Sequence, residues 1–184
     1  ENIRKILDSG TSEEKIKILE SLSFTDDVKI IQKIISKLDD DDIKVRGEAF
    51  SSLVLNENKI SDILIQNLKS QNKNIRGAVS LVLANRNDSN AIKEIVKLTY
   101  DQYSMVRECA LGALGHLNAK EAKDVICNGL LDSDLEVRKS ALQAVIDIGD
   151  SLSENIIKEI SLKKDSELDR LIGKVKRESG PKGI

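Results

Sequence analysis

Residues 132–145 read Asp-Ser-Asp-Leu-Glu-Val-Arg-Lys-Ser-Ala-Leu-Gln-Ala-Val, and this stretch contains the pattern that decides the fold. Val137, Ala141 and Val145 recur every four residues, which places them on one face of a helix. An Asp before such a run accepts hydrogen bonds from the free amides of the first helical turn. The stretch therefore predicts a helix that begins at an aspartate turn and buries one aliphatic face.

The same pattern recurs along the chain at a nearly constant distance. A β-branched residue followed by Arg occurs four times, and the arginines are 30, 31 and 31 residues apart: Arg46, Arg76, Arg107 and Arg138. Each copy has small or apolar residues three and seven positions after its Arg, so each predicts the same helix. The register reaches Lys15 and Asp169 at the two ends, where the apolar positions persist without the Arg. Such a loss is expected of end units, which lack one neighbour.

Further helical segments, shown by their apolar spacing, lie between these helices at about 28–38, 60–68, 91–100, 119–131 and 152–162, with a shortened first helix at Arg4–Leu7. Helix-start residues occupy the turns: Asp39 to Asp42, Asn72, Asn74, Ser104, Asp132, Asp134, Asp165 and Ser166. The predicted class is all-α, a solenoid of about six helix pairs. The pairs span residues 1–179 as one domain, with repeats near 1–24, 25–56, 57–87, 88–118, 119–149 and 150–179. Residues 180–184 are expected to be a flexible tail.

The sequence resembles the HEAT repeat family, in the short form of 30 to 31 residues that also occurs in phycobilisome-lyase-like repeats. Residues 132–145 carry the resemblance best, followed by Val106–Gly115. It implies a right-handed α-α superhelix with the Val-Arg helices on its concave side. It also implies a structural ladder in which Arg46, Arg76, Arg107 and Arg138 bond acidic or carbonyl groups of a preceding turn, such as Asp42, Asp101 or Asp134. The alternative for this arginine column is a site for an anionic ligand.

Composition restricts the class of protein. The chain has 29 basic and 31 acidic residues, a formal net charge of -2, which argues against general coating of nucleic acid or of an acidic membrane. Cys109 and Cys127 form no CxxC pair and no disulfide framework, as in reduced cytosolic proteins. No apolar stretch is long enough for a membrane span, and Glu1–Lys5 lacks a signal-peptide core. A soluble cytoplasmic protein is expected.

No catalytic or metal site can be assembled from the sequence. The run Asp39–Asp42 lacks the alternating ligands and the closing Glu of an EF-hand, which favours a solvated turn over a calcium site. His116 is the only histidine, and a single His cannot form a metal site by itself. No nucleophile stands at a recognisable spacing from a base. We therefore expect a non-catalytic protein without metal or cofactor.

A partner-binding groove is predicted from helix geometry. Rotating by 100° per residue from the apolar core of each Val-Arg helix gives the opposite, concave face. The predicted groove residues are Gly47, Ser51, Val54, Gly77, Leu81, Ala84, Glu108, Gly112, Gly115, Lys139, Gln143 and Ile146, with Ile16, Glu20 and Ser23 in the first repeat. Small residues with scattered apolar anchors favour a protein partner, either a helix or an extended peptide. The alternative is a shallow groove whose small residues only permit packing between repeats.

A second functional class rests on the carboxyl end. The local formal charge there is +4, and this charge could contact phosphate. It counts one acidic side chain, Glu178, and five basic side chains: Arg170, Lys174, Lys176, Arg177 and Lys182. A solvated end cap is the favoured explanation, and nucleic acid is not the expected partner.

Overall fold

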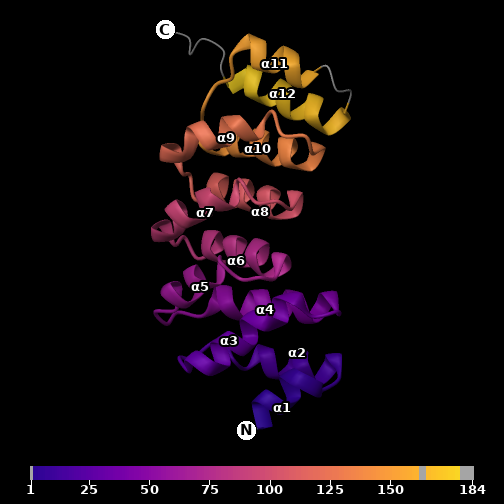
Figure 1. Ribbon diagram of the computed structural model, residues 1–184, viewed down its shortest axis with the longest axis vertical. Coiled ribbons are helices and arrows are strands. Elements are labelled where there is room, and N and C mark those ends of the chain that lie inside the picture. The colour runs from indigo at the N-terminus through magenta and orange to yellow at the C-terminus, as the bar shows by residue number, and fades with distance from the viewer. Residues whose placement is uncertain (1, 162–164, 179–184) are drawn as a thin grey trace. The chain divides into compact units, whose positions relative to one another are not determined.

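The computed structural model describes residues 2–161 and 165–178, and over these ranges the chain is helical (Figure 1). Twelve α-helices and no strand are present in the described ranges, which confirms the all-α class. The helices are α1 (Asn2–Ser9), α2 (Ser12–Glu20), α3 (Val28–Ser36), α4 (Ile43–Leu55), α5 (Ser61–Asn67), α6 (Lys73–Asn85), α7 (Ile92–Leu98), α8 (Ser104–His116), α9 (Lys123–Gly129), α10 (Leu135–Asp147), α11 (Glu154–Ser161) and α12 (Ser166–Glu178). The predicted tail, 180–184, lies outside the described residues.

The helices gather into two compact units, Glu1–Ala91 and Ile92–Ile184, named the N-terminal unit and the C-terminal unit. In the N-terminal unit α4 packs against both α2 and α6, and α3 lies beside α4 (Figure 1). In the C-terminal unit α10 packs against both α8 and α12, with α9 beside α10. Each unit is thus a stack of helix pairs, and one continuous solenoid over residues 1–179 stays a prediction.

The predicted aliphatic faces form the core. Val45, Ala49 and Leu53 of α4 have no exposed surface. The corresponding Ile75 of α6 is half-buried. The other corresponding residues of the Val-Arg helices have no exposed surface: Val79, Leu83, Val106, Ala110, Leu114, Val137, Ala141 and Val145. Burial of such side chains stabilises the fold by about 25 cal/mol per Å² of apolar surface. The repeat register therefore located the core correctly.

The Val-Arg helices α4, α6 and α10 each begin at a polar residue whose side chain accepts amides of the first helical turn. Asp42 accepts the amide of Lys44, and Asp134 accepts the amides of Glu136 and Val137. These bonds satisfy the free amides of the first turn. Helix α8 differs, because Tyr103 stands at its cap position without a side-chain cap bond. The expectation that Ser104 starts this helix as a cap is wrong, since Ser104 is its first helical residue.

Three Val-Arg helices, α6, α8 and α10, are each followed by a residue in the left-handed backbone conformation. Asn87, Asn118 and Gly149 have φ values of 56°, 50° and 70°, and they are spaced by 31 residues. In each case the amide of the next residue reaches a carbonyl five positions back, such as Asp150 to Val145 at 3.1 Å. This closure satisfies the last carbonyls of the helix and turns the chain toward the next repeat.

No helix in the described ranges has the length and apolar character needed to cross a membrane.

Candidate functional site

The arginine ladder, Arg46, Arg76, Arg107 and Arg138, binds backbone carbonyls. In every copy Nη1 donates to the carbonyl six residues upstream, in the turn before the helix: Asp40 at 2.7 Å, Ser70 at 2.9 Å, Asp101 at 2.9 Å and Asp132 at 2.6 Å. A charged donor makes a stronger bond to a carbonyl than a neutral donor does. One edge of each guanidinium group is therefore occupied by its own repeat.

Arg107 and Lys15 of the register also reach the next repeat. Nε and Nη2 of Arg107 donate to the two carboxylate oxygens of Asp132 at 2.8 and 2.9 Å, and both side chains are largely buried. Lys15 donates to Asp40 at 2.8 Å over the same separation of 25 residues. Lys15 stands where the other repeats have Arg. It therefore still forms the link between the first and second repeats.

The pKa values of these aspartates reflect the pairing. Burial by itself would raise the pKa of Asp132, but the Arg107 guanidinium and the Asp134 amide outweigh it and hold that pKa below its usual value. The pKa of Asp40 is likewise lowered, because bonds from Lys15 and the Asp42 amide outweigh burial. The expected arginine partners Asp42 and Asp134 cap their own helices instead. At the far end of the register, Arg138 Nε is buried without a hydrogen-bond partner in the described part of the chain.

Helix α4 exposes part of the predicted groove. Gly47 and Ser51 are exposed and Val54 is half-buried. The same face also carries Ile43, which is 71 % exposed, and Leu55, which is 66 % exposed. Because these residues follow one another at steps of four, they form a stripe of apolar and small residues that winds slowly around the helix: Ile43, Gly47, Ser51 and Leu55. No atom outside the helix's own backbone lies within 4 Å of a Cβ built on Gly47.

Four predicted groove residues are buried and cannot contact a partner in this structure: Gly77, Ala84, Gly115 and Ile146. For Gly115 the reason is the packing of α8 on α10. A Cβ added to Gly115 would lie 2.8 Å from the Cα of Ala144 and 2.9 Å from Oδ2 of Asp147. Gly115 thus permits close approach of two helices, which was the alternative explanation for the small residues.

The remaining predicted groove residues are half-buried, apart from the exposed Glu20: Ile16, Ser23, Leu81, Glu108, Gly112, Lys139 and Gln143. Lys139 is surrounded by the carboxylates of Glu136, Asp165 and Glu167 at 3.2 to 3.5 Å. These bonds raise the pKa of Lys139, the Glu136 bond most of all, and the ammonium group is already occupied. Gln143 donates to Asp147 at 2.8 Å.

Sequence reasoning did not find the most exposed apolar side chain, Phe24, which is 85 % exposed. It lies in the loop after α2, and its carbonyl accepts a 3.0 Å bond from Asn58. Asn56 bonds the neighbouring Thr25 carbonyl at 2.8 Å, so the loops after α2 and α4 are joined. The signal that could have found Phe24 is the repeat register itself, because 31 residues separate Phe24 from the exposed Leu55.

Two glutamates on the Val-Arg helices have raised pKa values. Burial, together with the nearby charge of Glu20, raises the pKa of Glu48. Burial, together with Glu136 and Asp134, raises the pKa of Glu108. Both carboxylates are thus disfavoured by their surroundings when ionised.

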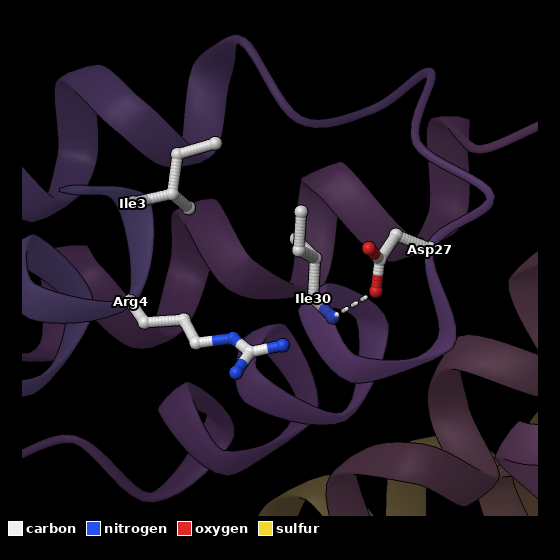
Figure 2. Close-up of a pocket in the computed structure, with 4 residues that line it drawn as sticks. All are labelled: Ile3, Arg4, Asp27 and Ile30. Carbon is white, nitrogen blue, oxygen red and sulfur yellow. Dashed lines mark hydrogen bonds between the residues drawn. The ribbon is translucent and has the colours of Figure 1, made fainter. Parts of the chain in front are cut away.

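A separate pocket of about 450 Å³ lies between α1 and the start of α3 and is lined by Ile3, Arg4, Asp27 and Ile30. Figure 2 shows the Asp27 carboxylate turned to the amide of Ile30, a 3.1 Å bond that caps α3. The carboxylate is therefore already used for helix structure, and the other three residues offer one guanidinium group and two apolar side chains.

The groups considered for chemistry have structural partners or low reactivity. Cys109 and Cys127 are free, and burial raises the pKa of Cys109 to about 11 and also raises that of Cys127. Both thiols are therefore protonated near neutral pH, whereas the thiolate is the nucleophile. Within the described ranges no three His, Cys, Asp or Glu side chains gather as metal ligands.

The sequence contains one acidic run and one basic cluster, and their side chains have different surroundings. In the run Asp39–Asp42, Asp39 accepts bonds from Asn72 and Asn74, Asp40 pairs with Lys15, and Asp42 caps α4. At the carboxyl end Arg170 and Lys174 are exposed on α12. The side chains of Lys176, Arg177 and Lys182 lie outside the described part, so the phosphate-contact alternative stays a prediction.

Comparison with known proteins gives the fold and a family match over part of the chain. The family model for HEAT repeats matches residues 61–147. The structure of the CpcE–CpcF complex of phycocyanin lyase from Nostoc has a TM-score of 0.69 and 18% identity, over 82% of this chain and 99% of that chain. No curated protein matches the chain in sequence.

Two further solved structures share the fold at low identity. A designed armadillo repeat protein in complex with the peptide (KR)4 has a TM-score of 0.54 and 15% identity, over 96% of this chain and 98% of that chain. A structure from a study of TOG–tubulin binding specificity has a TM-score of 0.55 and 16% identity, over 96% of this chain and 81% of that chain. The chain therefore has the HEAT/armadillo type of repeat fold, and its residues 61–147 match the HEAT repeat family model.

Proposed function

We propose that the protein is a non-catalytic scaffold that holds a partner helix or an extended peptide on the exposed face of α4. The observation that carries this proposal is the stripe Ile43, Gly47, Ser51 and Leu55, which is apolar or small and open to solvent. Large exposed apolar side chains gain about 25 cal/mol per Å² when a partner covers them. The small residues between them allow a partner backbone to approach closely.

Proteins of this fold support the same assignment. The names of the similar structures describe a repeat protein bound to the peptide (KR)4, the complex of CpcE with CpcF, and TOG binding to tubulin. The lyase activity belongs to that protein and is not carried over to this chain. A cytoplasmic location stays a prediction from the two unpaired cysteines.

The test begins with a random peptide display library selected on the whole chain. Selected peptides are then titrated by fluorescence anisotropy against wild type and against Gly47→Gln with Ser51→Gln. The long side chains add bulk without charge, and the open surroundings of Gly47 should leave the fold intact. We expect Kd to rise by about tenfold or more, a loss of about 1.4 kcal/mol.

The matched control places the same bulk elsewhere, at the exposed positions Ser89→Gln and Ser133→Gln. It should bind the selected peptides as wild type does. Failure to select any peptide, or equal binding by both double variants, would remove the α4 face as the partner site.

A further inference from the structure

Two exposed apolar side chains stand at or just after the carboxyl-terminal ends of α2 and α4, and each of these helices also carries a glutamate. Phe24 and Leu55 are 85 % and 66 % exposed, and the loops that follow their helices are hydrogen-bonded through Asn56 and Asn58. Both residues occupy the same register position in consecutive repeats, and α2 packs against α4. The two side chains therefore flank one junction between repeats.

The acidic members of this region come from the same two helices. Glu20 precedes Phe24 by four residues, and Glu48 precedes Leu55 by seven, two helical turns on the same face. Burial, and after it the nearby charge of Glu20, raises the pKa of Glu48. In the described part of the chain neither Glu20 nor Glu48 forms an ion pair. The acidic-apolar patch is defined as Glu20, Phe24, Glu48 and Leu55.

This patch specifies the chemistry of its occupant. Covering Phe24 and Leu55 requires apolar side chains, and a cation near Glu20 and Glu48 would remove the repulsion between their charges. An acidic peptide or an anionic membrane would add to that repulsion. The two-turn spacing from Glu48 to Leu55 corresponds to about 10 Å along a helix. A helical partner matches this distance with an apolar anchor and a Lys or Arg about seven residues apart.

We propose that the partner segment is amphipathic and basic, an inference that rests on the proposed function. Its apolar side chains lie on Phe24 and Leu55, and its Lys or Arg side chains lie at Glu20 and Glu48. The patch continues the α4 stripe, because Leu55 belongs to both. The same segment therefore covers the stripe and the patch.

Parallel selections from one random peptide display library test this partner chemistry. The targets are the wild-type chain, the variant Glu20→Gln with Glu48→Gln, and a control, Glu121→Gln with Asp124→Asn. The control removes two exposed carboxylates from the C-terminal unit. Wild type and control should enrich peptides with Lys and Arg in excess of Asp and Glu beside Leu, Ile or Phe. The Glu20/Glu48 variant should lose that excess.

Titrations at two salt concentrations then measure the charge contribution. Peptides selected on wild type should bind the Glu20/Glu48 variant about tenfold more weakly at low salt, with a smaller difference at high salt, because added ions screen exposed charges. Phe24→Ser with Leu55→Ser should also lose binding, and the exposure of both side chains lets the fold persist.

Three results would overturn the inference: wild-type peptides that are acidic or uncharged, an equal basic excess on the Glu20/Glu48 variant, or binding of wild type to phosphatidylserine vesicles in place of peptides. If the peptides selected on wild type in such a case still bind the Gly47→Gln with Ser51→Gln variant more weakly, the scaffold function stands and only the partner chemistry is wrong. If no selected peptide responds to either set of changes, both proposals fail.

Discussion

Arg107 bonds two repeats at once, which makes it the most informative single residue for the ladder. It donates to the Asp101 carbonyl within its own turn and forms a two-bond pair with Asp132 of the next repeat. Arg107→Ala would leave both acceptors without this partner in a largely buried place. We expect a loss of about 1 to 3 kcal/mol in unfolding free energy, measured as a lower melting temperature by circular dichroism.

The pH dependence of that loss provides its control. The pKa of Asp132 lies below the ordinary value of 3.8 in the folded chain, so its pairing stabilises the fold fully above that value. This stabilisation disappears as the pH falls through the folded pKa. The difference between wild type and Arg107→Ala should therefore persist near neutral pH and shrink below about pH 4. Unchanged stability together with lost binding of an anionic partner would show that the ladder is a ligand site instead.

The arginine column could be predicted from spacing, but its side-chain acceptor could not. Asp132 and Asp134 lie two residues apart in the same turn, and the sequence prediction named Asp134 among the example partners. The amides of α10 already bond the Asp134 carboxylate, which leaves Asp132 to face Arg107. Which aspartate pairs with Arg107 depends on the direction in which the turn points each carboxylate. The sequence does not give this direction, because both residues are aspartates of the same turn.

At the scale of the helix, backbone conformation separates two glycines that share open surroundings. Gly149 ends α10 with φ of 70°, whereas Gly47 lies within α4, and an added Cβ meets no atom within 4 Å at either site. Gly149→Ala should lower stability by about 1 to 2 kcal/mol, because a Cβ is disfavoured in the left-handed region. Gly47→Ala should raise stability by up to about 1 kcal/mol, since Ala has the higher helix propensity.

Urea unfolding of both variants measures these changes, and Gly149→Asn supplies a further comparison. Asn already fills the same position at Asn87 and Asn118, so it should cost less than Ala. Equal effects of Ala at positions 47 and 149 would contradict the assigned helix end.

At the scale of the whole molecule, a disturbance in one repeat should remain local, because the repeats of a solenoid contact mainly their neighbours. Gly115→Ala would press a Cβ against the backbone of Ala144 and force α8 from α10. Such overpacking costs about 1 to 3 kcal/mol. Hydrogen exchange followed by mass spectrometry should show faster exchange in α8 and α10, with the rates of α2 and α4 unchanged.

Equal acceleration in all helices would instead show that the chain unfolds as one cooperative block. Gly112→Ala serves as the comparison on the same helix, because Gly112 is half-buried whereas Gly115 is fully packed. It should leave the exchange of α10 closer to wild type.

The sequence by itself determined the all-helical class, the repeat length, the aliphatic core and the arginine column. These features follow from periodicities of about 3.6 residues within a helix, which local spacing records directly, and of 31 residues between repeats. Only the tertiary structure decided which residues of the opposite face reach solvent. Gly47 and Gly77 share one register position, yet Gly47 is exposed and Gly77 is buried. The physical reason is that exposure depends on the atoms that other segments place over a position, and helical register does not encode those atoms.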